Sequence, residues 1–263
     1  MSLYDDIITK AKGLGFEKVY FTQPKTIETG NSRLVSNPLD LYGWTTCVLL
    51  LAYPYKPFCE GEVVSGYYLA SNESYHKLRD FITWLNDIGI QAKRVSLPVK
   101  KAVVSANIGT VGRNTLLRLK EYGSRIVLYA VAIDTCAPLS YNEPAQPCGE
   151  CRACIDACPG KAIGETPYDY IKSKCLRYYM EDDEYPTWVK ENVNMYLGCE
   201  RCMFACPYNE AVGTLQPSDE VRQAFDFDRI LSGDIEKAIQ YVGSNVDKKR
   251  LMRDAAILKE NKK

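Results

Sequence analysis

The sequence predicts an α/β fold in three parts: an N-terminal lobe of helices and strands, a cysteine-rich lobe and a short helical C-terminus. Three observations support this prediction. Over about the first 140 residues, helical periodicity alternates with short apolar runs that are typical of strands. Eight of the 11 cysteines gather between residues 148 and 206. Residues 218–260 show helical spacing without a strand pattern. We therefore expect domains over residues 1–140, 141–212 and 213–263.

Composition narrows the class of protein. Of the 263 residues, 46% are hydrophobic and 25% are charged, which is typical of a globular chain. The 33 basic residues balance the 33 acidic ones, so no field favours nucleic acid, and we expect no nucleic-acid partner. The longest apolar run, Cys47–Tyr53, is too short for a bilayer, and the N-terminus lacks signal-peptide features. We expect a cytoplasmic protein with no membrane partner.

The first lobe begins with a helix and two strands. Apolar residues share one face over residues 3–13, and glycines follow, which predicts a helix. Residues 16–22 alternate as a strand does. Residues 24–40 are rich in turn-forming residues and predict a long surface connection. The continuous apolar run Thr45–Tyr53 predicts a strand buried on both faces.

The rest of this lobe predicts further alternation. Six apolar residues recur at helical spacing between Tyr75 and Ile88, and residues 89–95 can form a strand. Pro98 suits the first turn of a helix that runs to about Ala106. Residues 114–120 and 125–133 flank a glycine turn and predict a hairpin. The order of these elements favours a three-layer α/β lobe.

The C-terminal part predicts short helices. The last one, from Asp247, places Leu251, Ala255 and Leu258 on one face and seven Lys or Arg elsewhere. A basic face could contact phosphate, but a solvated helix surface is the interpretation that we favour.

The cysteines carry the strongest chemical signal, because they form two sets followed by proline. The first set is Cys148, Cys151, Cys154 and Cys158; the second is Cys175, Cys199, Cys202 and Cys206. The first has the C-x2-C-x2-C-x3-C-P spacing of bacterial two-cluster ferredoxins, in which the fourth cysteine binds the other cluster. We therefore assign one 4Fe–4S cluster to Cys148, Cys151, Cys154 and Cys206. The other is assigned to Cys158, Cys175, Cys199 and Cys202.

Closely spaced cysteines also occur in zinc sites and in disulfides. Paired C-x2-C units also bind zinc, but zinc ribbons separate two pairs and have no use for a third cysteine at this step. Disulfides are disfavoured because no secretory signature accompanies the cysteines. Cys47, Cys59 and Cys136 lie outside the spacing, and we expect Cys47 to be an inert buried thiol.

Other motifs give a weaker indication of function. His76 is the only histidine, so a Ser-His-Asp set is excluded. It could bind a cofactor or donate a proton, although a structural histidine is the interpretation that we favour. The stretch Gly109–Thr115 (GTVGRNT) could face a cofactor, yet it has neither Walker nor Rossmann spacing. Alone it indicates only a glycine turn.

Together these features resemble a known family. The cysteine sets, Tyr75-His76-Lys77 and Gly109–Thr115 occur in the order found in the epoxyqueuosine reductases, cobalamin-dependent iron–sulfur proteins related to the reductive dehalogenases. The resemblance covers roughly residues 3–212. It implies a nitroreductase-like first lobe that binds cobalamin and two clusters that pass electrons to the cobalt. It also implies a set of cofactor-binding residues: Tyr75, His76, Gly109, Gly112, Arg113 and Asn114.

One departure from the family concerns the proton donor. The family's V-D-[ST]-x-P-V stretch carries an acid, and Val95 stands at its place in this sequence. Valine cannot donate a proton, so another group would have to act. By residue type the candidates are Tyr68, Tyr75, Lys100 and Arg113, and the catalytic residue stays unassigned.

Three hypotheses for function follow. The first is an iron–sulfur reductase that delivers electrons through two clusters to a corrinoid and acts on an unidentified small molecule, with a redox partner as electron source. The second is a ferredoxin-type carrier or corrinoid reductant without a substrate of its own. The third keeps transfer RNA modification, with the basic C-terminal helix contacting phosphate.

Overall fold

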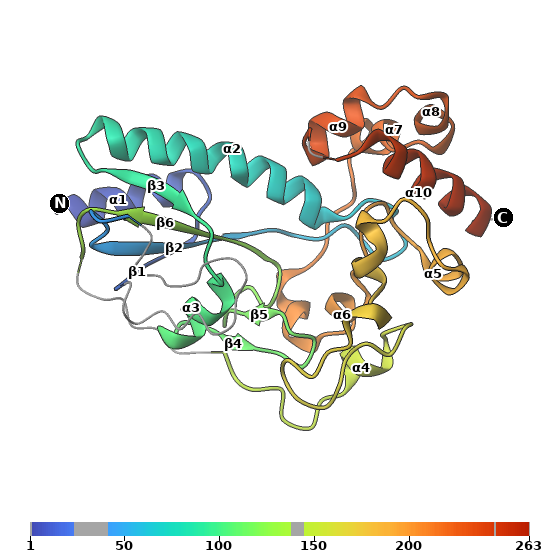
Figure 1. Ribbon diagram of the computed structural model, residues 1–263, viewed down its shortest axis with the longest axis horizontal. Coiled ribbons are helices and arrows are strands. Elements are labelled where there is room, and N and C mark those ends of the chain that lie inside the picture. The colour runs from blue at the N-terminus through green and yellow to red at the C-terminus, as the bar shows by residue number, and fades with distance from the viewer. Residues whose placement is uncertain (1, 24–41, 138–144, 245, 263) are drawn as a thin grey trace. The chain divides into compact units, whose positions relative to one another are not determined.

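The structure is a computed structural model that describes residues 2–23, 42–137, 145–244 and 246–262 (Figure 1). The predicted connection over residues 24–40 lies outside the described residues. The chain divides into two compact units. Unit 1 comprises Met1–Pro54, Glu73–Val111 and Leu116–Pro147, and unit 2 comprises Tyr55–Asn72, Gly112–Thr115 and Cys148–Lys263. The predicted domain boundaries at residues 140 and 212 stay a prediction.

Unit 1 is built on a four-stranded sheet in the order β1-β2-β6-β3, with antiparallel pairing throughout. Its centre is β2 (Cys47–Pro54) beside β6 (Ile126–Ile133), and its edges are β1 (Lys18–Thr22) and β3 (Ala92–Val95). From Cys47 to Tyr53 every residue of β2 is buried, which confirms the strand predicted from the apolar run. Burial on both faces explains why the run does not alternate.

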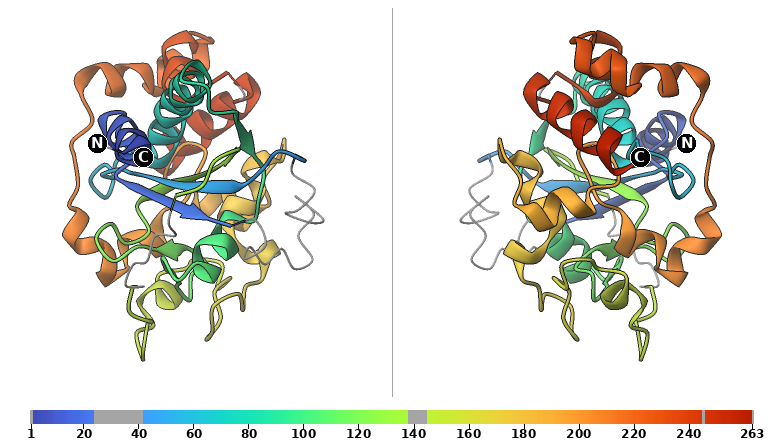
Figure 2. Two further views of the ribbon diagram at one scale, coloured as in Figure 1. Left: turned by 90° about the vertical axis from the view of Figure 1, so that its left-hand side faces the viewer. Right: turned by 90° about the vertical axis from the view of Figure 1, so that its right-hand side faces the viewer.

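Helices cover one face of this sheet. Figures 1 and 2 show α1 (Leu3–Gly13) and the unit 1 part of α2 (Gly66–Asp87) on the same side. A capping box between Ser2 and Asp5 starts α1, and the helix ends before Gly15, whose φ of 91° few other residues adopt. The predicted helix over residues 3–13 is confirmed, and that between Tyr75 and Ile88 is confirmed but starts earlier.

The opposite face packs against α3 (Val99–Ser105) and a short ribbon, which completes three layers within unit 1. The ribbon pairs β4 (Thr110–Val111) with β5 (Leu117–Arg118). The predicted hairpin between residues 114–120 and 125–133 is therefore wrong, because β5 pairs with β4 and not with β6. Leu117 and Val111 are buried against the sheet, and their burial selects a pairing that local pattern cannot reveal.

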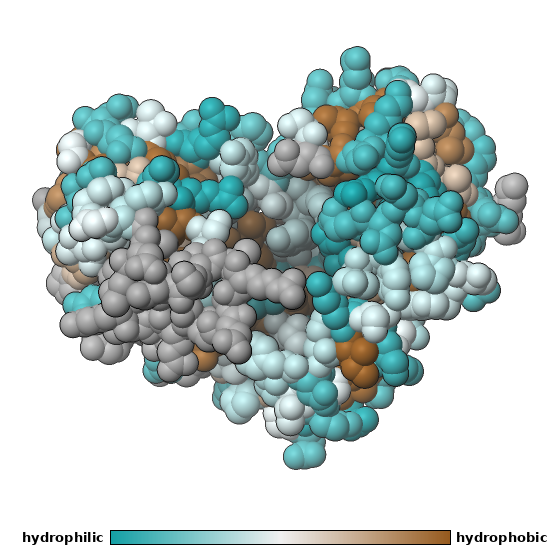
Figure 3. Space-filling view, in the orientation of Figure 1, coloured by the Kyte–Doolittle hydropathy of each residue, from teal (hydrophilic) through white to brown (hydrophobic). Residues whose placement is uncertain are grey.

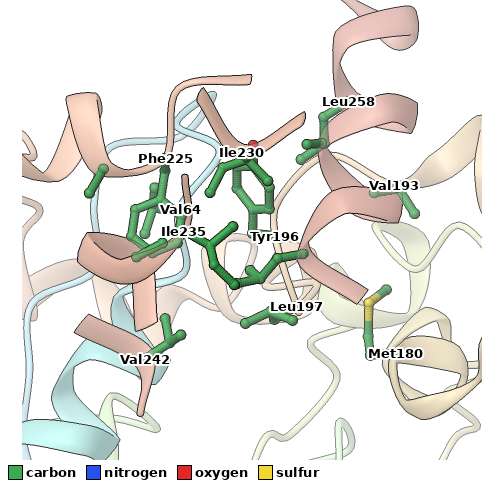
Figure 4. Packing of buried hydrophobic residues seen from close by; sticks show 14 of the residues in the cluster. Val64, Met180, Val193, Tyr196, Leu197, Phe225, Ile230, Ile235, Val242 and Leu258 are labelled. Atoms are coloured by element: carbon green, nitrogen blue, oxygen red, sulfur yellow. The ribbon is translucent and has the colours of Figure 1, made fainter. Parts of the chain in front are cut away.

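Unit 2 contains the cysteines and the C-terminal helices. Four helices, α7 (Asp219–Ala224), α8 (Phe227–Ser232), α9 (Glu236–Val242) and α10 (Lys248–Asn261), pack on a shared apolar core. Figure 4 shows Tyr196 and Leu197, which precede the last cysteines, in this core. The predicted short helices are thus confirmed. Among the described residues, no helix has the length and apolar character needed to cross a membrane.

Candidate iron–sulfur and cofactor site

Each run of closely spaced cysteines in unit 2 includes a four-residue helix. In the first, α4 (Ala153–Asp156) follows Cys151 and contains Cys154. In the second, α6 (Arg201–Phe204) follows Cys199 and contains Cys202. The two helices pack against each other. The face drawn in Figure 3 is mostly hydrophilic, with hydrophobic groups over the region of α7 and α9 and over the α2 region of unit 1.

The thiols of the first predicted cluster lie close enough to interact electrostatically. Burial raises the pKa of the Cys154 thiol, and the neighbouring thiols of Cys206, Cys148 and Cys151 raise it further. These are the three partners that the spacing assigns to Cys154. A buried thiolate is costly unless cations balance it, and iron ions supply that positive charge when bound.

The thiols of the second predicted cluster form a corresponding group. Burial raises the pKa of Cys202, followed by the thiols of Cys199, Cys175 and Cys158, and lastly that of Cys154 from the other group. Burial also raises the pKa of Cys199, and Cys175 and Cys158 contribute to the rise. Thiols predicted to share a cluster therefore lie together, and the donor chemistry fits two cubanes. The assignment of individual ligands stays a prediction.

Within the described residues, no three His, Cys, Asp or Glu side chains converge closely enough to hold one metal ion. The four thiolates of a cubane each bind a different iron, so they surround a larger object than a zinc ion.

Two predicted cofactor residues form hydrogen bonds to the backbone of the cysteine loops. Arg113 donates from its guanidinium to the carbonyl oxygens of Cys151 at 2.8 Å and Gly149 at 2.9 Å. Asn114 donates from its amide to the carbonyl oxygen of Cys202 at 3.4 Å. The segment Gly112–Thr115 thus joins the loops of both sets. Sequence reasoning identified the segment but missed this contact, which a glycine turn does not reveal.

Of the other predicted cofactor residues, Tyr75, His76 and Gly109 lie in unit 1, and Gly112 lies in unit 2. Tyr75 and His76 are exposed on α2, and their rings meet edge to face. Gly109 is buried, and a Cβ there would lie 2.9 Å from the carbonyl oxygen of Arg118, so glycine allows the β4–β5 approach. The role of all six residues toward a cofactor stays a prediction.

The candidate proton donors differ in acidity. Burial raises the pKa of Tyr68 to about 12, which weakens it as an acid near neutral pH. Desolvation instead lowers the pKa of Lys100, although part of its side chain is exposed. Val95 ends β3, pairs with Ala130 and is buried in the core, so its position serves packing.

Buried acids near the cysteines were not predicted. Glu200, between Cys199 and Cys202, is buried and accepts a hydrogen bond from the Ser65 hydroxyl at 2.5 Å. Asp254 on α10 is fully buried; it accepts from the Leu197 N–H at 2.9 Å and the Tyr185 hydroxyl at 2.8 Å. Desolvation raises the pKa of Asp254 despite these bonds. A signal was present, because Asp254 falls on the apolar face of its helix.

Known proteins resemble the chain in both sequence and fold. A family model described as a 4Fe-4S double cluster binding domain matches residues 147–209. An epoxyqueuosine reductase from Atelocyanobacterium thalassa is 27% identical over 253 residues, covering 80% of this chain and 81% of that protein. An epoxyqueuosine reductase from Pseudomonas aeruginosa is 30% identical over 204 residues, covering 72% of this chain and 54% of that protein. The second match therefore spans about half of the relative's length.

Solved structures share the fold. An epoxyqueuosine reductase from Streptococcus thermophilus aligns with a TM-score of 0.76 at 20% identity, covering 99% of this chain and 82% of that one. Another, solved with an epoxyqueuosine-modified tRNA stem loop, aligns with a TM-score of 0.72 at 19% identity, covering 98% and 81%. A reductive dehalogenase described as B12-dependent aligns with a TM-score of 0.51 at 16% identity, covering 97% of this chain and 35% of that chain.

One expectation about partners is overturned. Balanced charge led us to expect no nucleic-acid partner, but a relative with this fold has been solved with a modified tRNA stem loop. Overall net charge fails as a criterion here because it averages over the whole surface, whereas RNA contact needs only a local patch. The two-cluster interpretation agrees with the matched domain. In sequence and fold the chain is similar to the epoxyqueuosine reductases, and residues 147–209 match a 4Fe-4S double cluster binding domain.

Proposed function

We propose that this iron–sulfur reductase passes electrons through its two 4Fe–4S clusters to a corrinoid and reduces a modified nucleoside in RNA of the tRNA type. The observation that carries the proposal is the grouping of eight thiols into two adjoining sets in a fold that epoxyqueuosine reductases share. Removal of an epoxide oxygen as water takes two electrons and two protons. Two one-electron clusters match that electron count.

The residues assigned to the corrinoid are Tyr75, His76, Gly109 and the Gly112–Asn114 stretch. When bound, the corrinoid would supply the low-potential cobalt chemistry that protein side chains lack. The chain itself would hold the clusters, through Arg113 and Asn114 on the cysteine loops, and would supply a proton. Lys100 on α3 is our candidate donor because desolvation lowers the pKa of its ammonium group, which makes that group a stronger acid.

An anaerobic reconstitution tests this proposal in two stages. Cobalamin added to the reduced protein should change its visible spectrum, and a stem loop carrying epoxyqueuosine should then lose one oxygen by mass spectrometry. Binding of the stem loop should weaken as salt rises, because phosphate contacts release counterions. An unchanged cobalamin spectrum together with an unaltered RNA would refute the proposal.

A second function is favoured by one observation, the burial of apolar Val95 at the family's acid position. A ferredoxin-type carrier or corrinoid reductant needs no proton donor. This alternative predicts rapid electron exchange with a redox partner and no turnover of RNA. Turnover that Lys100→Met abolishes, in a protein with intact clusters, would exclude it.

A further inference from the structure

An exposed patch of unit 2 lies at the second set of cysteines. Tyr168 is 57% exposed, Ile171 47% and Tyr178 41%, and Tyr170 also reaches the surface. Lys172 and Lys174 lie between them and are exposed. We call these six residues the cluster-side patch. Soluble proteins rarely concentrate large apolar groups on one surface without a partner for them.

The patch is joined directly to a predicted cluster ligand. Cys175 follows Lys174, and its backbone N–H donates to the Lys172 carbonyl at 3.0 Å. Its own carbonyl accepts from the Tyr178 N–H at 3.0 Å. Tyr170 lies within hydrogen-bonding reach of the Cys175 thiol. A partner bound here would therefore lie next to a predicted ligand of the second cluster.

Two lysines carry positive charge on the patch, and the exposed carboxylate of Asp169 lies in the same stretch. The Lys172 ammonium lies 4.8 Å from the centre of the Tyr178 ring, and neither Lys172 nor Lys174 is paired with a carboxylate among the described residues. Two nearby acids are engaged elsewhere. Glu181 pairs with Arg177 and Arg250, and Asp169 accepts from the backbone N–H of Glu165 at 3.1 Å. The lysines thus remain available to an acidic partner.

The loop of the first set offers no such surface. Its exposed neighbours are Gly149, Glu150 and Arg152, and Arg152 is paired with Glu165. In the part of the chain that the structure describes, no large hydrophobic side chain is exposed on the Cys148–Cys154 loop.

We propose that the cluster-side patch is the docking surface for an acidic protein that donates one electron at a time, and that electrons enter at the second cluster. Tyrosines at the centre and lysines around them fit a small, transient redox interface, in which charge speeds the encounter. The inference rests on the clusters of the proposed function, but it needs neither the corrinoid nor RNA. Single-stranded RNA would also stack on tyrosines, yet only an electron donor has a reason to bind at a cluster ligand.

The test compares two double variants by stopped flow. The first variant, Lys172→Glu with Lys174→Glu, reverses the charge of the cluster-side patch. The second, Lys12→Glu with Lys237→Glu, makes the same change in charge on exposed residues elsewhere and is the control. An acidic plant-type [2Fe–2S] ferredoxin is the donor probe, and photoreduced deazaflavin is a small reductant that needs no docking. Iron counts and electron paramagnetic resonance confirm that the clusters are intact in each variant.

We expect the patch variant to be reduced by the ferredoxin at least about tenfold more slowly at low salt, with the difference disappearing at high salt. Reduction by deazaflavin should stay unchanged. Tyr168→Ser should slow the ferredoxin reaction at high salt as well. The proposal is overturned if the two double variants behave alike or if both reductants slow equally. Loss of stem-loop binding with an unchanged ferredoxin rate would overturn it in favour of RNA.

Discussion

Single residues in unit 2 decide how many clusters the protein holds. Cys175 is the one predicted ligand that lies far from the closely spaced runs, and its thiol interacts electrostatically with those of Cys199 and Cys202. Cys175→Ala should remove the second cluster and halve the iron and sulfide content, because the first cluster keeps all four of its thiols. Cys59→Ala, outside both sets, is the control and should keep the full content. Full iron in the Cys175 variant would contradict the ligand assignment.

Val95 shows how one side chain limits the chemistry of a site. It is 7% exposed, and its neighbours in the core are apolar. Val95→Asp should therefore lower the stability of unit 1 by on the order of 3 kcal/mol rather than restore a proton donor. Thermal unfolding would report this as a shift of about 2–4 °C for each kcal/mol. Ser96→Asp at the exposed neighbouring position should change little; equal stability of the two variants would show that residue 95 is not a core position.

At the scale of elements, a close backbone contact positions the second set of cysteines. Gly160 follows the Cys158-Pro159 pair, and a Cβ there would overlap the carbonyl oxygen of Lys174, the residue before Cys175. Gly160→Ala should push Cys158 and Cys175 apart and reduce the occupancy of the second cluster, which its paramagnetic signal measures. Gly13→Ala, where a Cβ meets open space, is the matched control. A full signal in the Gly160 variant would mean that this contact can shift without harm.

Around the predicted clusters the helices are short, and side-chain hydrogen bonds hold the loops next to them. Helices α4 and α6 have four residues each, too few to be stable alone. Arg113 and Asn114 hold their loops by hydrogen bonds to backbone carbonyls. Bound metal would add the remaining stability, because ligand binding and local folding are coupled in such sites.

At the scale of the whole molecule, the C-terminal helices share a core with the cysteine region. Asp254 of α10 bonds Leu197, two residues before Cys199, and Tyr196 packs on Phe225. A chain that ends after Pro217 should expose this core, lose solubility and fail to hold the second cluster. Removal of only Lys262 and Lys263 is the control and should have no effect. If the shorter chain kept both clusters, residues 213–263 would be an independent segment.

Periodicity and spacing predicted much of this protein from local information. The strands β2 and β6, the helix α1 and the two sets of cysteines all follow from residues close in sequence. The burial of Cys47 was also expected and is confirmed. Local patterns suffice in these cases because burial on both faces, helix capping and loop ligation each depend on neighbours along the chain.

The remaining features of the fold and the site depend on contacts between residues that are distant in the sequence. The sequence could not tell that β5 pairs with β4, that Arg113 braces the first cysteine loop, or that buried Asp254 ties α10 to Leu197. Each of these contacts joins polar groups that are distant in the sequence, or selects one strand partner among several of similar pattern. Such choices follow from which groups are buried together and must satisfy one another's hydrogen bonds, and only the folded chain brings those groups together.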